Sequence, residues 1–167
     1  MAGPSYRITR SADGRIAVRL MPREREILGA LVTDLAGETD ADDADDPGLA
    51  RLRPPAFPDD PEAAAAFREL VAEDLEDQRQ ARLATVAATI DATVLDDAQA
   101  AAWLGAVNDL RLVHGTRLGV TEDSEPEPID EHDPDAGRRL VFLWLGWIEE
   151  QLVDAMAAGL PDTAEAG

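Results

Sequence analysis

The residues best suited to chemistry lie in one stretch, Trp103 to Asp123, which reads WLGAVNDLRLVHGTRLGVTED. It combines a tryptophan, an Asn-Asp pair, two arginines, a histidine and several glycines within about six helical turns. Asn108 is the only asparagine in the chain, although asparagine is a poor helix former. We therefore expect Asn108 and its polar neighbours to have a specific role, either structural or functional.

Helical spacing divides this stretch into two adjacent faces. One face holds Trp103, Val107, Leu110, His114 and Leu118, and the other holds Leu104, Asn108, Arg111 and Gly115. Two interpretations stay open for the polar positions, which are Asn108, Asp109, Arg111, His114 and Arg117. They form a binding surface, in which Arg111 presents its planar guanidinium to a carboxylate. Alternatively, they form a polar network that ties this helix to the last one through Glu149 or Glu150.

The residue types favour no enzyme class. The chain has no cysteine and no lysine, so thiolate catalysis, disulfides and cysteine metal sites are excluded. It has no glycine-rich phosphate loop and no serine in a nucleophile elbow. His114 borders an apolar face and His132 an acidic loop, without metal-ligand spacing. Residues 40–46 lack the glycine and glutamate of a calcium loop. We expect a non-enzymatic protein without metal or cofactor.

The charge distribution points to the N-terminal end. The chain carries a formal charge of −20, yet residues 1–25 hold six arginines against Asp13 and Glu24. This segment is therefore at +4 and the remainder at −24. A basic end on an acidic body suggests self-association or an anionic partner at that end. Equally open is an internal arrangement, in which the protein's own acidic loops cover the basic residues.

The first residues predict a β-hairpin. Residues 6–10 and 15–21 alternate in polarity around a turn that ends in Asp13-Gly14. A three-residue loop with a left-handed Gly14 places Ile8 opposite Val18 and gives one apolar face. In that register the arginines that point outward, as the expected contact with DNA or another partner, are Arg7, Arg15 and Arg19.

The remaining periodicity predicts a mainly α-helical, four-helix bundle-like domain over residues 1–160. The hairpin occupies 1–21 and the helices 22–37, 61–90, 96–118 and 134–158, joined by an acidic, proline-rich connection at 38–60 and an acidic loop at 121–133. Residues 93–95 suit a short third strand, and 161–167 a disordered tail. Gly37 and Gly119 are the expected helix stops, and Asp96 with Gln99 forms a capping box.

Trp103, Trp144 and Trp147 are expected in the core. The last helix is apolar on nearly all sides from Leu140 to Ile148, so it is expected to be the central helix of the core. No apolar run reaches the length of a membrane span, and the first residues lack a secretory signal. We therefore expect a cytoplasmic protein with no membrane partner.

Several segments resemble one known family. They are RIAVRLMPREREIL, DDPEAAAAFRELVAEDL, VLDDAQAAAWLGAVNDLRL, HGTRLGVTED and LWLGWIEEQLV, which together cover most of the chain. These motifs are similar to an actinobacterial family long catalogued as a domain of unknown function, the AosR-like oxidative-stress transcriptional regulators. The resemblance implies stress-responsive transcription, with RNA polymerase or a sigma factor as partner. Redox sensing through a thiol pair, attributed to the regulator, is impossible here because cysteine is absent.

Two functional hypotheses follow. The first is a transcription-associated regulator that acts mainly through protein contacts, with a limited DNA contact at the hairpin, because β-ribbons enter DNA grooves. The acidic body opposes extensive phosphate contact. The second is a small adaptor or structural subunit that docks through the face of Asn108 and Arg111.

Overall fold

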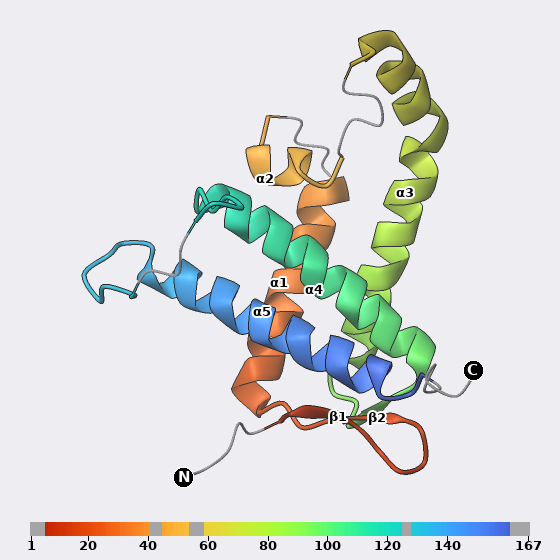
Figure 1. The fold of residues 1–167 in the computed structure, drawn as a ribbon, viewed down its shortest axis with the longest axis vertical. Helices are drawn as coiled ribbons and strands as arrows, with labels where there is room; N and C mark the ends of the chain where they lie inside the picture. Colours follow the sequence, from red (N-terminus) through yellow and green to blue (C-terminus); the bar gives the residue numbers. More distant parts are fainter. Residues whose placement is uncertain (1–5, 41–44, 54–58, 125–127, 161–167) are drawn as a thin grey trace, which may run out of the picture.

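The protein is mainly α-helical, with a small antiparallel sheet beneath the helices in a computed structural model that describes residues 6–40, 45–53, 59–124 and 128–160 (Figure 1). The strands are β1 (Ile8–Arg10), β2 (Ile16–Val18) and β3 (Val94–Leu95), and the helices are α1 (Pro22–Asp40), α2 (Pro47–Ala50), α3 (Pro61–Thr89), α4 (Asp97–Arg117) and α5 (Ala136–Ala157). The expected tail at 161–167 lies outside the described residues, as do parts of the connection, the acidic loop and the residue 40–46 segment.

The hairpin has the predicted register. Ile8 pairs with Val18, and Gly14 adopts a positive φ of 82°, which ends the three-residue loop. The predicted third strand is present, because β3 pairs antiparallel with β2 in the order β1-β2-β3. Ile8, Ile16 and Val18 are almost fully buried, so the apolar face of the sheet forms the floor of the core.

Several helix ends follow local sequence signals. The Asp96 side chain accepts a hydrogen bond from the backbone of Gln99, and the Gln99 side chain accepts one from the Asp96 backbone, which completes the predicted capping box. Beyond α4, Gly119 has a φ of 71°, and Val120 N–H donates to the carbonyl of Gly115. This is the Schellman geometry that a glycine stop favours.

Two predicted ends are wrong. The first helix does not stop at Gly37 but continues to Asp40, because Thr39 is buried and accepts a hydrogen bond from Gln80 of α3. The last helix begins at Ala136 rather than at 134. Asp133 accepts hydrogen bonds from the Asp135 backbone and the Arg139 side chain, which holds the preceding turn outside the helix.

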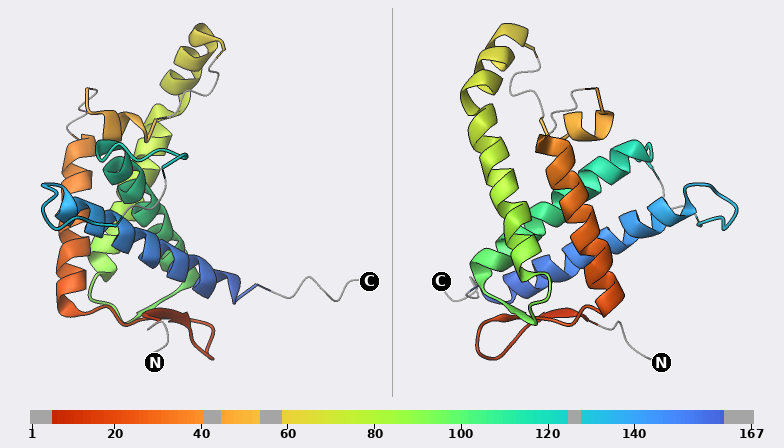
Figure 2. Two further views of the ribbon diagram at one scale, coloured as in Figure 1. Left: turned by 60° about the vertical axis from the view of Figure 1, so that its left-hand side comes forward. Right: turned by 180° about the vertical axis from the view of Figure 1, so that it is seen from behind.

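The long helices form two crossing layers rather than an aligned bundle. Figure 1 shows α4 and α5 side by side, with α1 and α3 behind them, and the rear view in Figure 2 agrees. α4 packs against α1, α2, α3 and α5, so it is the central helix. The expectation that the last helix is central is therefore wrong, since Leu140 and Leu143 of α5 are more than half exposed. Within the described residues, no helix is both long and apolar enough to cross a membrane.

Gly37 offers a direct test of this corrected helix end. It lies inside α1, and a Cβ added there would meet no atom within 4 Å. Gly37→Ala is expected to raise the free energy of unfolding by about 0.5–1 kcal/mol, because alanine loses less backbone entropy in a helix. Urea unfolding measures the change.

Gly115→Ala is the control, because its Cβ would lie 2.9 Å from the Phe142 ring and the free energy of unfolding should fall. An unchanged or lower stability for Gly37→Ala would contradict the helix end.

Candidate functional site

The polar residues of the Trp103–Asp123 stretch do not form one surface. The turn of α4 directs them towards different neighbours, so that each of α1, α2, α3 and α5 receives at least one polar contact from α4. This arrangement places these polar residues where the helices meet rather than around a single cavity.

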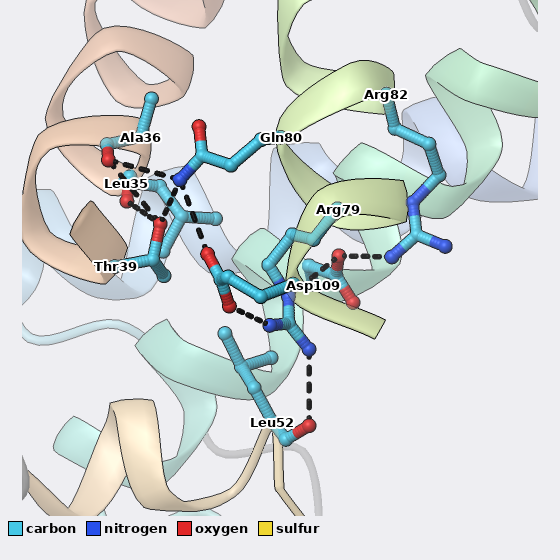
Figure 3. A network of polar contacts seen from close by, with 9 residues as sticks. Leu35, Ala36, Thr39, Leu52, Arg79, Gln80, Arg82 and Asp109 are labelled. Carbon is cyan, nitrogen blue, oxygen red and sulfur yellow. Dashed lines mark hydrogen bonds and ion pairs between the residues drawn. The ribbon is translucent and has the colours of Figure 1, made fainter. Parts of the chain in front are cut away.

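Asp109 lies at the junction with α3. It is 7% exposed, and its carboxylate accepts a hydrogen bond from Arg82 at 2.8 Å and lies 3.5 Å from the Nε of Arg79 (Figure 3). Arg79 is itself 6% exposed, pairs with Glu76 at 2.6 Å and donates to the carbonyl of Leu52 at 3.0 Å. A buried arginine needs such partners, because an unpaired charge in the interior is costly.

Gln80, in the same turn of α3, forms hydrogen bonds with α1. Gln80 donates to the hydroxyl of Thr39 at 2.8 Å and to the carbonyl of Ala36 at 3.3 Å, as Figure 3 shows. We call the set Glu76, Arg79, Gln80, Arg82 and Asp109 the anchor cluster. It fixes the middle of α3 to α1 and α4, so the orientation of everything on α3 before residue 76 depends on it.

Arg111 lies at the junction with α5. Its guanidinium pairs with Glu149 and stacks 5.3 Å from the centre of the Phe142 ring. Gly115 and Gly146 border these side chains, and a Cβ on Gly115 would lie 2.9 Å from Phe142. Glu149 was one of the two partners that the sequence suggested for a network to the last helix.

Arg117 lies at the end of α4, beside α1 and the start of α2. It donates to Glu38 at 2.9 Å and to Asp46 at 3.0 Å. Backbone hydrogen bonding, chiefly from Leu49, and Arg117 lower the pKa of Asp46 against the opposing effect of burial. Asp46 thus caps α2 and joins it to α4 at once.

His114 is half-buried near the same end of α4. Burial, followed by the positive charges of Arg117 and Arg138, lowers its pKa below the ordinary 6.5, against the opposing effect of Glu38. It borders a cavity of about 60 Å³ between α1 and α4, where apolar side chains and the polar groups of Asp34, Glu38 and Arg117 form the rest of the lining. This volume holds a water or two, whereas small-molecule sites occupy about 300 Å³ or more.

Trp103 and Asn108 have opposite environments. Trp103 is fully buried, and its indole N–H donates to the hydroxyl of Thr89 at 2.8 Å, as expected for a core tryptophan. Trp144 and Trp147 are only partly buried against the core. Asn108 is exposed, and its side chain has no hydrogen-bond partner within the described part of the chain. Leu112, one turn further on, is 36% exposed, so both belong to the outward ridge of α4.

The hairpin arginines are largely neutralised by the protein itself. Arg7 pairs with Glu24 at 3.3 Å, and Arg15 pairs with Asp13 at 3.0 Å. Arg10 pairs with Asp97 at 2.8 Å. Arg19 is exposed and forms no ion pair with any described residue. The partners of Arg7 and Arg15 belong to the same N-terminal segment, whereas Arg10 pairs with an acidic residue outside it.

Sequence reasoning missed four polar residues that organise the fold. Arg79 and Gln151 stand on apolar helical stripes, a signal of a buried polar partner. Gln151 accepts backbone hydrogen bonds from Arg7 at 2.6 Å and Ile8 at 3.0 Å, and so joins α5 to the edge of β1. Arg82 completes the anchor cluster. Arg25 donates to the carbonyls of Val18, Leu20, Ile90 and Ala92, and no local pattern indicates these partners.

The chain matches the family model described as Domain of unknown function (DUF2017) over residues 5–156. The chain belongs to this family. No curated protein and no solved structure matches the chain. No group of three His, Asp or Glu side chains within the described ranges is placed to hold a metal ion.

The lowered pKa of His114 makes stability depend on pH. The unfolded chain takes up a proton near pH 6.5, whereas the folded chain resists protonation until a lower pH. Stability from this group is therefore complete above pH 6.5 and is lost as the pH falls towards the lower folded pKa. Urea unfolding at pH 7.5 and 5.5 should show a smaller loss for His114→Gln than for the natural chain. Equal losses for both proteins would contradict the assignment.

Proposed function

We propose that this protein is a non-enzymatic, cytoplasmic regulator that acts on transcription through contacts with another protein. The observation that carries the proposal is the contrast between its charged and apolar surfaces. Arg7 and Arg15 are paired internally, which weakens the case for a DNA contact. Large apolar side chains meanwhile stay exposed, with Leu70 at 79%, Leu140 at 57% and Leu143 at 54%. Exposed apolar groups of this kind favour a protein partner.

The link to transcription comes from the resemblance to the AosR-like oxidative-stress regulators of actinobacteria. RNA polymerase or a sigma factor is the partner that this resemblance implies. Thiol chemistry cannot carry the signal in a chain without cysteine. A stress input would then reach this protein through its partner or through its abundance.

Two measurements test the proposal. Affinity purification of the tagged chain from cells should retain RNA polymerase subunits or a sigma factor in amounts comparable to the bait. A gel-shift series at increasing salt should show no specific retention of a promoter fragment by the purified chain, since a charge of −20 opposes phosphate contact. Specific retention at low salt would instead assign a direct DNA contact, with Arg19 as the first residue to substitute.

The adaptor hypothesis remains the second proposal, because Asn108 is exposed beside Leu112 without a partner among the described residues. Arg111 contributes less to such a face, since it is paired with Glu149. Asn108→Ala should leave stability unchanged within about 0.5 kcal/mol, as expected for a surface position. Loss of a protease or metabolic enzyme from the purified complexes of that variant would favour the adaptor over the regulator.

A further inference from the structure

The first half of α3 extends away from the body of the protein. Figures 1 and 2 show this part of the helix projecting beyond α1 and α2. We call residues 61–78 the α3 arm. Among its described side chains only Ala64 is buried, whereas Arg79, Leu83 and Val86 of the following turns are buried in the body. The arm is therefore a helix with most of its surface available to a partner.

The arm carries an apolar stripe. Phe67, Leu70, Val71 and Leu75 follow the i, i+3, i+4, i+8 spacing of one helix face. Phe67 is 41% exposed, Leu70 79% and Leu75 50%, and Val71 is half-buried. Leu70 and Leu75, on the two edges of the stripe, are at least half exposed. Exposed leucines on an amphipathic helix match the way a helix lies in an apolar groove of a partner.

The charges around the stripe define what can cover it. The arm carries five exposed carboxylates without an ion pair among the described residues, namely Glu62, Glu69, Glu73, Asp74 and Asp77. A second copy of the chain brings another −20 charge, and nucleic acid and anionic membranes are repelled in the same way. The complementary occupant is a protein surface with an apolar groove edged by arginine or lysine.

The sequence and the anchor cluster preorganise the arm. Asp60 caps its first turn, Pro61 opens it, and Glu62 is favourably placed near the positive end of the helix dipole. Residues 63–66 are alanine, the best helix former. At the base, Arg79 and Gln80 hold the helix to α4 and α1. A helix that is already formed and fixed loses less conformational entropy on binding.

We propose that the α3 arm is the docking element of this protein for a cationic, apolar groove on a protein partner. The inference rests on the proposed function, because it assumes that the chain acts by binding another protein. Leu70 and Leu75 enter the groove, and Glu69, Glu73 and Asp77 face its basic edge.

The binding chemistry can be measured with a defined probe. A fluorescent helical peptide of about 18 residues, with leucine on one face and lysine on the other, spans roughly the length of the arm. The full chain should bind it, and Leu70→Asp with Leu75→Asp should weaken binding at least about tenfold, as for residues at an interface centre. The control, Tyr6→Asp with Met21→Asp, makes the same change on two exposed side chains near the sheet, which are 56% and 54% exposed, and should stay within about twofold.

A second variant tests the charge without altering the apolar stripe. Glu69→Gln, Glu73→Gln and Asp77→Asn together should weaken binding of the peptide and flatten its salt dependence between about 50 and 500 mM. Circular dichroism confirms that the helix persists in each variant. Failure of the natural chain to bind the peptide, or equal losses in the arm variant and the Tyr6 and Met21 control, overturns the proposal.

Photo-crosslinking in cells separates this inference from the proposed function. A photoreactive amino acid replaces Leu70 in one chain and Leu143 in another. A product from position 70 whose crosslinked segment is rich in arginine or lysine supports the arm, even if that protein is unrelated to transcription. Recovery of RNA polymerase with crosslinks from position 143 alone supports the proposed function and overturns the arm. A neutral or acidic crosslinked segment at position 70 also overturns it.

Discussion

Asp109→Ala is expected to lower the free energy of unfolding by about 3 kcal/mol, the lower end of the range for breaking a buried ion pair. The carboxylate is 7% exposed and is shared by Arg82 and Arg79. Without it the buried guanidinium of Arg79 keeps only Glu76 and the Leu52 carbonyl, so the loss stays below that of a wholly unpaired charge. Equilibrium unfolding in urea measures the effect.

Two matched variants show whether the loss comes from the buried ion pair. Asp77 is an exposed carboxylate on α3, two residues before Arg79. Asp77→Ala should therefore change the free energy of unfolding by no more than about 0.5 kcal/mol. Arg79→Met combined with Asp109→Leu should recover part of the loss, because an apolar pair of similar volume avoids the unpaired charge. An Asp109→Ala protein as stable as Asp77→Ala would show that the anchor cluster does not hold α3.

Trp103→Ala is expected to cost about 3–5 kcal/mol, as for other large aromatic side chains removed from a core. Trp103 is fully buried in the first half of α4, and its indole N–H donates to Thr89 of α3. The substitution therefore removes packing between α3 and α4 and one hydrogen bond. Thermal unfolding should show a decrease of several degrees or a loss of the cooperative transition.

Two further tryptophan substitutions test how the loss of stability depends on side-chain volume and on burial. Trp103→Phe keeps most of the volume and should lose about 1–2 kcal/mol, chiefly the hydrogen bond and part of the ring contact. Trp147→Ala removes a partly buried indole from α5 and should cost less than Trp103→Ala. Equal losses of unfolding free energy in Trp103→Ala and Trp147→Ala would contradict the prediction that burial in α4 contributes more to stability than partial burial in α5.

The polar residues of α4 have structural contacts that account for most of them. Asp109, Arg111 and Arg117 each pair with carboxylates or guanidinium groups on other helices. The Trp103–Asp123 stretch thus defines how α4 meets α1, α2, α3 and α5. The surfaces left for a partner lie on the α3 arm and on the outward ridges of α4 and α5. This division explains why only His114 and Arg117, of the polar residues in this stretch, line the cavity of about 60 Å³.

The sequence alone determined the features that depend on neighbouring residues. Alternating polarity and a glycine that accepts positive φ fix the register of Ile8 opposite Val18. The capping box of Asp96 and Gln99 and the glycine stop at Gly119 act over three or four residues, so they are readable from spacing. The mainly helical class follows from periodicity for the same reason.

Tertiary structure decided whatever depends on residues far apart in the chain. α1 continues past Gly37 because Thr39 meets Gln80, and α4 rather than α5 is central because helix packing chooses which apolar stripe is covered on more sides. Asp109 could not be assigned to Arg79 and Arg82 from spacing, because charged side chains pair by proximity in space. The projection of the α3 arm has the same origin, since only packing determines where a continuous helix leaves the body.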